Sequence, residues 1–203
     1  THADTIIIAS IDNATKEVKL VSIYRDTLIE SMDGEMRKAN SGYFLGGPQE
    51  AINTLNKNLD LDIEHYVTVD FKALADVIDL LGGIEVDVTE QEADAINDYI
   101  VETAMVAGKD AVMVSGGLQT LDGVQAVTYA RIRKDAVSGD HRRNERMKIL
   151  VVAVFDKLKT TEITELDDMT NLVLPQIKTN MTNAEMVDLL LDFPAYDIST
   201  SPS

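Results

Sequence analysis

Residues 65–88 read HYVTVDFKALADVIDLLGGIEVDV, and the pattern of apolar side chains changes twice within this stretch. The first six residues largely alternate between polar and apolar, which predicts a strand. Residues 71–81 place their leucines and isoleucine at helical spacing, and Gly82 supplies a stop for that helix. Residues 84–88 alternate again and predict a second strand. A strand, a helix and a strand in succession indicate an α/β protein.

Strands and helices continue to alternate on both sides of this stretch. Residues 5–10 and 18–23 are mostly apolar and are separated by a turn at Asp12-Asn13, so they predict a hairpin in a sheet buried on both faces. Further helices are expected at residues 48–58, 90–106, 121–130, 140–158, 162–174 and 183–192.

The expected architecture is a single three-layer α/β domain over residues 1–198, followed by a mobile tail at 199–203. Its central mixed β-sheet, with helices on both faces, would carry residues 5–10, 18–23, 65–70 and 84–88. A chain of 203 residues with 45% hydrophobic residues is long and apolar enough to bury one core of this kind.

Composition excludes several kinds of site. The chain contains no cysteine, which rules out disulfides, a thiol nucleophile and thiolate zinc sites. It contains no apolar run of 18 residues, so nothing in it is expected to span a membrane. Because the sequence starts at Thr1-His2 without methionine and reaches an apolar run by Thr5, we expect a signal or anchor segment to precede it.

Five of the seven arginines lie between residues 131 and 146, in a chain with 18 basic and 35 acidic residues and a net charge of −17. These five are Arg131, Arg133, Arg142, Arg143 and Arg146. Guanidinium groups bind carboxylate or phosphate oxygens through a rigid fork of donors. We therefore expect a local site for a compact anion such as a diphosphate. A nucleic acid is not expected as a partner, because it would also meet the acidic remainder of the surface.

The helix expected after Asp140 combines one of these arginines with an apolar stripe. Arg143 lies one turn before the stripe, where the helix dipole favours an anion. The stripe comprises Met147, Leu150, Val151, Val154, Phe155 and Leu158. A charged head at the end of an apolar face suits an amphiphilic phosphate. On periodicity alone, however, an ordinary core-facing helix explains the stripe better.

Other candidate residues are weaker when taken singly. Arg131 and Arg133 point the same way only if their segment is extended. Arg25-Asp26 follows an apolar strand, where α/β proteins commonly place functional groups, and an ion pair that closes a turn explains the pair equally well. Asp4 is read as a solvated terminus unless a hard cation such as Mg²⁺ gives its carboxylate a role.

Taken together, the motifs resemble the LytR-CpsA-Psr family of bacterial cell-envelope proteins, and the resemblance covers nearly the whole chain. The matching pieces, in order, are Asp4-Thr5 before an isoleucine-rich strand, residues 21–27 (VSIYRDT), residues 38–40 (KAN) with Gly46-Gly47-Pro48, residues 66–71, residues 80–88 (LLGGIEVDV), residues 117–119 with 121–123, residues 129–133 (YARIR), and Asp140 with Arg143 and Arg146.

This resemblance implies a specific activity. Family members are membrane-anchored, face outward and transfer glycopolymers from a polyprenyl (di)phosphate carrier to the cell wall, usually peptidoglycan, forming a phosphodiester with the help of Mg²⁺. The lipid lies in a long apolar pocket between sheet and helices, and arginines hold its head group. An older name for the family, transcriptional attenuator, describes no mechanism.

The resemblance also assigns residues. Its metal-side aspartate corresponds to Asp4, and its catalytic arginines and aspartate correspond to Arg25, Asp26, Arg131, Arg133 and Arg143. Our candidates for the walls of the lipid pocket are Leu74, Ile78, Met147, Leu150 and Val154. The chain departs from the family pattern at His2-Ala3, where arginine and serine or threonine are usual, at Tyr24 in place of proline, and at Met147 in place of glutamine.

The expected function is therefore an Mg²⁺-dependent transferase of lipid-linked glycopolymers at the extracytoplasmic face of a bacterial membrane. Two alternatives use the same residues: a module that binds polyprenyl phosphate without turnover, and a hydrolase that cleaves the diphosphate with water. A DNA-binding regulator is disfavoured by the net charge of −17 and by the lack of a recognisable helix-turn-helix.

Overall fold

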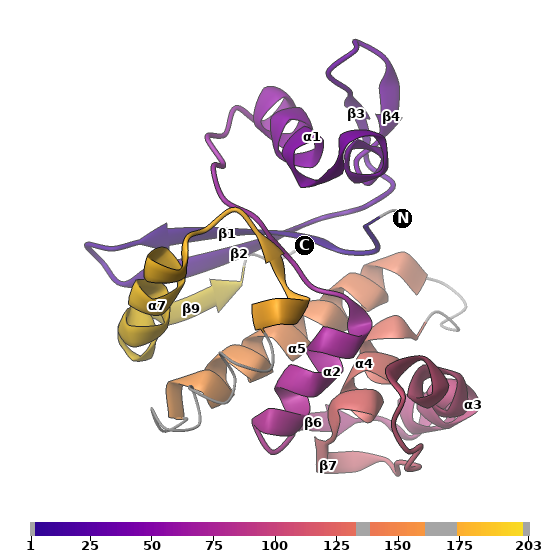
Figure 1. Cartoon of the computed structure of the whole chain (residues 1–203). Coiled ribbons are helices and arrows are strands. Elements are labelled where there is room, and N and C mark those ends of the chain that lie inside the picture. Colours follow the sequence, from indigo (N-terminus) through magenta and orange to yellow (C-terminus); the bar gives the residue numbers. More distant parts are fainter. Residues whose placement is uncertain (1–2, 133–138, 161–173, 201–203) are drawn as a thin grey trace. The chain divides into compact units, whose positions relative to one another are not determined.

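The computed structural model describes residues 3–132, 139–160 and 174–200. The chain forms two compact units. The first unit runs up to Thr68 and adds Lys178–Asp192 and the residues from Tyr196 onward, and the second comprises Val69–Ile177 with Phe193–Ala195. Figure 1 labels most of the helices and strands of both units.

A three-stranded sheet opens the first unit. β1 (Ile6–Asp12) and β2 (Glu17–Ile23) pair antiparallel as predicted, and β9 (Asp197–Thr200) adds to β2 in parallel. Along β2 buried and exposed residues alternate, so the expectation of a strand buried on both faces was wrong. Glu17, Lys19 and Val21 are exposed at every second position and keep one face of β2 in water. β9 also includes the first two residues that the sequence assigned to the tail.

A small core of Ile29, Ala39 and Leu55 lies in the remainder of the first unit. β3 (Leu28–Glu30) and β4 (Met36–Lys38) form a hairpin that precedes α1 (Ser41–Leu59). Further elements are β5 (Val67–Thr68), which pairs antiparallel with β8 (Lys178–Thr179), and α7 (Asn183–Asp192).

α1 contains a break that agrees with the helix start predicted at Pro48. Gly46 and Gly47 leave the helical conformation, and Gly47 has a φ of 72°, which glycine adopts without strain. Proline is well suited to the first turn of the helical segment that follows, because its missing N–H has no partner there.

The second unit contains the strand and helix pattern that the sequence shows most clearly. Its elements are α2 (Phe71–Leu80), β6 (Ile84–Val88), α3 (Glu90–Ala107), β7 (Gly117–Leu121), α4 (Gly123–Arg131), α5 (Gly139–Thr160) and the short 3₁₀ turns Leu174–Gln176 and Phe193–Ala195. Asp70, Thr89 and Asp122 cap the three helices that follow them by accepting a backbone N–H. These caps explain why the predicted starts of α2 and α3 are confirmed.

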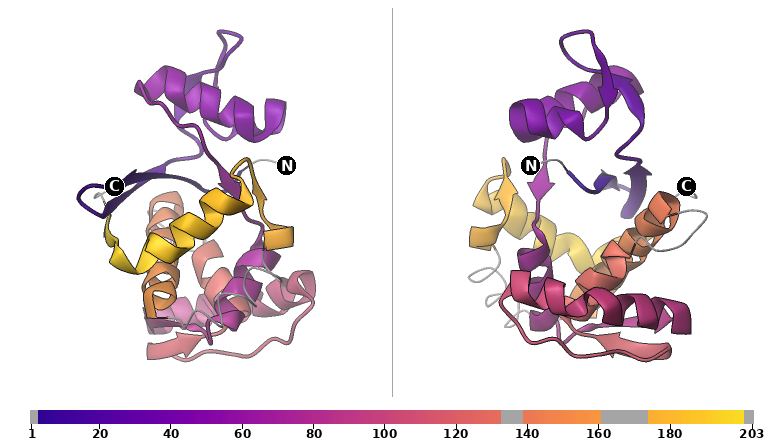
Figure 2. Two further views of the ribbon diagram at one scale, coloured as in Figure 1. Left: turned by 60° about the vertical axis from the view of Figure 1, so that its left-hand side comes forward. Right: turned by 90° about the vertical axis from the view of Figure 1, so that its right-hand side faces the viewer.

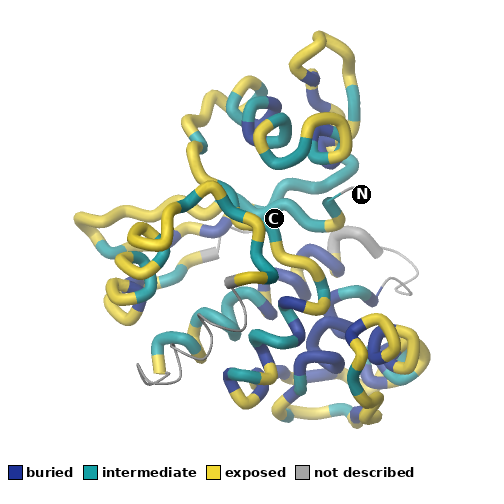
Figure 3. Tube along the Cα trace, viewed as in Figure 1, coloured by how far each residue is buried: buried dark blue, intermediate teal, exposed yellow. Residues whose placement is uncertain are grey.

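α4 is the centre of the second unit. It packs against α2, α3 and α5, and nearly all of its residues are buried (Figure 3). The views in Figure 2 show the same helices from two other sides. At its first residue, Gly123, a Cβ atom would lie 2.1 Å from the carbonyl oxygen of Ala75 on α2. Only glycine therefore permits these two helices to approach so closely.

The α/β class is confirmed, but the single central sheet was wrong. In the described part of the chain, the strands form one three-stranded sheet and three separate two-stranded sheets. The strand predicted at 65–70 pairs over two residues only, and β6 pairs with β7, which the sequence did not predict as a strand. β7 contains a glycine and a glutamine and only one β-branched residue, so its strand propensity is weak.

The structure leaves two expectations untested. The helix predicted at 162–174 falls almost entirely outside the described residues, and the lipid pocket stays a prediction. Among the described helices, none is both long enough and apolar enough to cross a bilayer.

Candidate functional site

In the first unit, Arg25 lies between two carboxylates at the end of β2. Its Nη1 donates to Oδ1 of Asp4 at 3.0 Å, and its Nε donates to Oδ2 of Asp26 at 3.1 Å. The ammonium of Lys38 contacts the other oxygen of Asp26. These four residues, which we call the Arg25 cluster, include three of the candidates named from the sequence, Asp4, Arg25 and Asp26.

Asn40 holds the backbone on both sides of the Arg25 cluster. Its main-chain N–H donates to the carbonyl of Arg25 at 3.1 Å, and its side-chain Nδ2 donates to the carbonyl of Ala3 at 3.3 Å. Asn40 is 6% exposed. Sequence reasoning did not assign Asn40 or Lys38 to the site, although both belong to the KAN motif of the family resemblance.

The Arg25 cluster is close to electrically neutral. Hydrogen bonds from Lys38 and, after the opposing effect of burial, from Arg25 lower the pKa of Asp26 below its ordinary value. Asp26 is therefore ionised at neutral pH, and both of its oxygens already accept hydrogen bonds. Such a carboxylate orients Arg25 well but is poorly placed to remove a proton from an acceptor hydroxyl.

Asp4 is the carboxylate of this cluster that suits a metal ion. No group of three or more metal-binding side chains occurs in the described ranges. Mg²⁺ is commonly held by one or two carboxylates together with substrate phosphate oxygens, so a dedicated protein cage is not required. The Asp4 side chain is 48% exposed and could serve as such a single ligand.

In the second unit, Arg131 is held by neutral groups. It is the last residue of α4, and its Nη1 donates to the hydroxyl of Thr103 at 3.3 Å. Its guanidinium carbon lies 4.8 Å from the ring centroid of Phe71. Within the described ranges no carboxylate forms an ion pair with Arg131, and the groups that contact it there are uncharged.

Arg146 has a structural contact in place of the ligand contact that the arginine count suggested. Its Nε donates to Oε1 of Glu92 at 2.8 Å, its Nη1 donates to the carbonyl of Ile132 at 3.3 Å, and it is 2% exposed. Burial opposes the ionisation of Glu92, but the hydrogen bonds from Arg146 and Thr89 outweigh it and lower the pKa of Glu92. Arg146 therefore ties α5 to α3 and to the chain that follows α4.

The remaining site predictions stay open. Arg143 is buried on α5, and Arg133 lies outside the described residues. Arg25 belongs to the first unit and Arg131 and Arg143 to the second, so the convergence of the four arginines stays a prediction.

The five residues predicted to line a lipid pocket lie on α2 and α5. Ile78 and Leu150 are fully buried and Met147 is 8% exposed, whereas Leu74 and Val154 are partly buried. Burial of this kind is what both a packed core and a closed tunnel wall would show.

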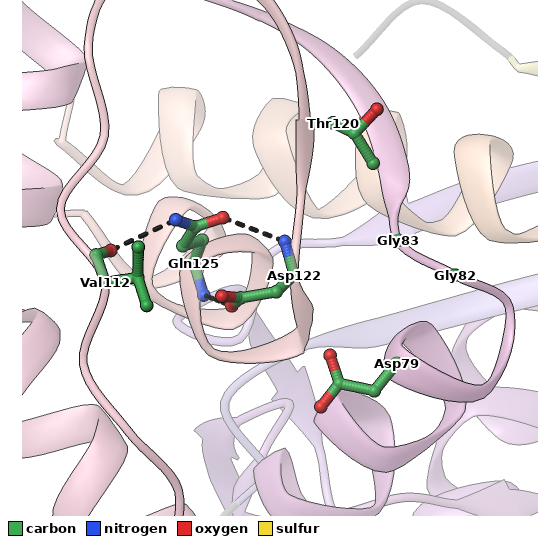
Figure 4. A pocket seen from close by; sticks show the side chains of 7 residues that line it. All are labelled: Asp79, Gly82, Gly83, Val112, Thr120, Asp122 and Gln125. Atoms are coloured by element: carbon green, nitrogen blue, oxygen red, sulfur yellow. Dashed lines mark hydrogen bonds between the residues drawn. The ribbon is translucent and has the colours of Figure 1, made fainter.

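A cavity of about 340 Å³ in the second unit is not a second candidate site. Its polar side chains already hold the structure together (Figure 4). Asp79 accepts the N–H of Gly123 at 2.6 Å, Asp122 accepts the N–H of Gln125, and the amide of Gln125 donates to the carbonyl of Val112. These groups cap α4 and fix the preceding loop, and the cavity carries no cationic side chain for a phosphate.

Comparison with known proteins agrees with the resemblance seen in the sequence. The chain is 31% identical over 190 residues to the polyisoprenyl-teichoic acid–peptidoglycan teichoic acid transferase TagU of Bacillus licheniformis, covering 93% of this chain and 57% of that protein. It is 32% identical over 188 residues to the corresponding transferase TagV of Bacillus subtilis, covering 91% and 46%.

The fold agrees with a solved structure described as the LytR-CPS2A-psr family protein YwtF (TagT) with bound octaprenyl pyrophosphate lipid. The TM-score is 0.76 at 21% identity, over 100% of this chain and 72% of that one. The chain spans about half the length of the curated relatives it matches. The model of the LytR_cpsA_psr family matches residues 1–200, and the chain therefore belongs to the LytR_cpsA_psr family.

Proposed function

We propose that this protein transfers a glycopolymer from a polyprenyl diphosphate carrier to a hydroxyl of peptidoglycan, at the extracytoplasmic face of a bacterial membrane. Two named relatives, TagU and TagV, are transferases of this kind for teichoic acid. A protein of the same fold holds octaprenyl pyrophosphate. Teichoic acid is one glycopolymer that fits, and the proposal extends to anionic glycopolymers as a class.

The observation that supports this proposal most is that the described contacts of Arg131 are uncharged. Among the described residues, this half-buried guanidinium contacts a ring and a hydroxyl, and neither of these groups competes with an anionic ligand for its charge. A diphosphate offers the oxygens that such a fork of donors binds best. By contrast, Arg25 and Arg146 already contact carboxylates in the protein.

In the proposed reaction, the residues of the protein bind the substrates and stabilise charge. Bonds form and break only in the substrates. The acceptor hydroxyl oxygen forms a bond to the phosphorus that carries the glycopolymer, and the bond from that phosphorus to the lipid phosphate breaks. Polyprenyl phosphate leaves, and the hydroxyl proton passes to water or to a base. Arg131, with Arg133 and Arg143, would neutralise the charge that develops on the leaving phosphate.

The Arg25 cluster has a different part in this proposal. Asp26 and Lys38 hold Arg25, and Arg25 in turn orients Asp4. Asp4 would hold Mg²⁺ together with diphosphate oxygens, and that ion would supply further charge neutralisation.

The proposal is tested by incubating the protein with a lipid-diphosphate-linked glycopolymer and peptidoglycan fragments and identifying the products. We expect glycopolymer joined to peptidoglycan only when acceptor and Mg²⁺ are present. Release of free glycopolymer phosphate without joining would indicate the hydrolase, and lipid binding without any product would indicate the binding module.

Arg131→Ala tests the anion site directly. We expect binding of a polyprenyl diphosphate to weaken by about 1.5–3 kcal/mol, which is the usual contribution of a charged hydrogen bond. The matched control is Arg37→Ala, since Arg37 pairs with Asp33 in the β3–β4 hairpin. Equal affinities of both variants and the unaltered protein would contradict the assignment of Arg131.

A further inference from the structure

Arg131 is held between two helices whose positions are themselves fixed. Phe71 is the first residue of α2, and the carboxylate of Asp70 caps that helix by accepting the N–H of Ala73 at 2.8 Å. The carboxylate of Asp79, near the other end of α2, accepts the N–H of Gly123 at 2.6 Å. α2 is therefore bonded directly to the start of α4, the helix that ends in Arg131.

The Phe71 ring is placed to restrict the guanidinium without neutralising it. A distance of 4.8 Å between the guanidinium carbon and the ring centroid lies within the range of a cation–π contact. The negative face of the ring attracts the cation, but the ring has no formal charge and accepts no strong hydrogen bond. The donors at the edge of the guanidinium therefore stay available to an anion.

Thr103 fixes the rotation of the same guanidinium. Its hydroxyl is 3.4 Å from the carbonyl of Tyr99 and donates to it, so a lone pair remains to accept from Arg131 Nη1 at 3.3 Å. Thr103 is 4% exposed on α3, which limits its movement. The Phe71 ring thus contacts the face of the guanidinium, and the Thr103 hydroxyl contacts its edge. Together they determine the plane of the guanidinium and the direction of its N–H donors.

A comparison within the same unit shows what this arrangement achieves. Arg146 is 2% exposed and contacts the carboxylate of Glu92, so its charge is balanced inside the protein. A carboxylate at the place of Phe71 or Thr103 would compete with a phosphate ligand for Arg131. A ring and a hydroxyl restrict the side chain of Arg131 as a carboxylate would, but they do not compete with the phosphate ligand.

We propose that Phe71 and Thr103 are positioning residues that preorganise Arg131 for the diphosphate head group. This proposal rests on the proposed function, because it assumes that Arg131 binds that group. It predicts that the two residues affect affinity for the charged head and leave affinity for the apolar tail unchanged.

The test measures equilibrium binding of two probes that share one tail, geranylgeranyl diphosphate and geranylgeraniol. Phe71→Leu keeps an apolar side chain but removes the ring. We expect it to weaken diphosphate binding about 3- to 10-fold, the range of a partly buried cation–π contact, and to change alcohol binding less than about 2-fold. Phe71→Tyr keeps the ring and should restore diphosphate binding. Thr103→Val keeps the shape of the side chain and should weaken the diphosphate alone about 3-fold.

The ratio of the two affinities separates positioning from a general loss of structure. Phe155→Leu is the matched control, since it removes a ring that contacts Phe193 in the same unit at a centroid distance of 5.0 Å. It should lower thermal stability and leave the ratio unchanged. If Phe71→Leu weakens both probes equally, or Phe71→Tyr fails to restore the ratio, the positioning proposal is overturned.

Arg131→Ala keeps this proposal distinguishable from the proposed function. In the Arg131→Ala background, Phe71→Leu should cause no further loss of diphosphate affinity, because the contact has already been removed. If Arg131→Ala itself has no effect, the proposed anion site fails. If Arg131→Ala weakens the diphosphate and Phe71→Leu does not, only the role of Phe71 is refuted.

Discussion

Individual arginines of this protein differ in what neutralises their charge. Arg25 contacts the carboxylates of Asp4 and Asp26, and Arg146 contacts that of Glu92. Arg131 contacts a ring and a hydroxyl. Residue type alone therefore does not identify an anion ligand, because the partners of the side chain decide how much charge remains for a substrate.

Met147 is the residue whose two interpretations can be separated most simply. At 8% exposure it is as buried as a core residue or a closed tunnel wall, although the family pattern has glutamine at this place. We expect Met147→Gln to lower the free energy of unfolding by roughly 1–3 kcal/mol, because a buried amide would lack partners. Chemical unfolding measures this loss, and Met147→Leu should change stability by less than about 1.5 kcal/mol. Unchanged stability with tighter diphosphate binding would place Met147 at the head group.

Sequence could select the arginines but could not assign their partners. Arg25, Asp26 and Asp4 were each named as candidates, and the structure shows that Arg25 contacts both carboxylates. The partners of Arg131 are 28 and 60 positions away along the chain, at Thr103 and Phe71, and neither carries a charge that would draw attention. Such contacts follow from how the helices pack, which no local pattern contains.

Single elements are joined by ion pairs as well as by apolar packing, and α2 shows this most clearly. Asp76 on α2 contacts Lys72 at 2.6 Å and Lys109 at 2.7 Å, and Lys109 also contacts Asp79 at 2.5 Å. Burial opposes the ionisation of Asp76, but these hydrogen bonds outweigh it and lower its pKa to about 2. The loop after α3 is thereby tied to α2.

This network should make stability depend on pH in a defined window. Because the folded-state pKa of Asp76 is lowered from 3.8 to about 2, its contribution is present above pH 3.8 and is lost as the pH falls toward 2. We expect Asp76→Asn to remove roughly 1–2 kcal/mol at pH 7 and to flatten the fall in stability between these two pH values. Unfolding by urea across a pH series measures both effects.

An exposed carboxylate of α3 provides the control for this prediction. Asp94→Asn changes the net charge by the same amount at a position that is open to solvent. If stability falls equally steeply with decreasing pH in Asp76→Asn and Asp94→Asn, the network makes no specific contribution to the pH dependence of stability.

The elements themselves were predicted where local signals were strong. Helices at 71–81, 90–106 and 183–192 carry both periodic apolar residues and capping residues, and all three are confirmed. β7, β8 and β9 were missed because they are five, two and four residues long and contain few strand-forming side chains. Their pairing depends on partners far along the chain, which supply the edge that makes them strands.

At the scale of the whole molecule, the net charge of −17 opposes the approach of any anion. Salt screens this long-range repulsion more strongly than the short contact between guanidinium and phosphate. We therefore expect the association rate of a fluorescent geranylgeranyl diphosphate analogue to rise roughly two- to fivefold between about 10 and 150 mM salt. Stopped-flow fluorescence measures this rate, and the uncharged alcohol should show no such rise.

The direction of this salt effect also distinguishes classes of protein. Binding to nucleic acid weakens as salt increases, because it depends on release of counterions from the phosphate backbone. An association rate that falls steadily with salt would contradict the picture of one local cationic site on an acidic surface.

Family membership follows from motifs spread over the whole chain, and one family model spans residues 1–200. The single domain expected at residues 1–198 stays a prediction. The chain forms two compact units, and its last strand, β9, returns to pair with β2 in the first unit. Such a return over more than 150 residues cannot be predicted from local periodicity, and the sequence analysis assigned the last two residues of β9 to the tail.

The contact between Glu92 and Arg146 has a consequence for how this sequence can change over time. Loss of either partner alone leaves a charge stranded in the interior, which is strongly destabilising, whereas replacing both by apolar side chains of similar volume can be nearly neutral. Arg146 also donates to the carbonyl of Ile132, one residue after Arg131. Mutational drift at positions 92 and 146 is therefore coupled, and a lineage that loses this pair must do so through a less fit intermediate or in a single double replacement.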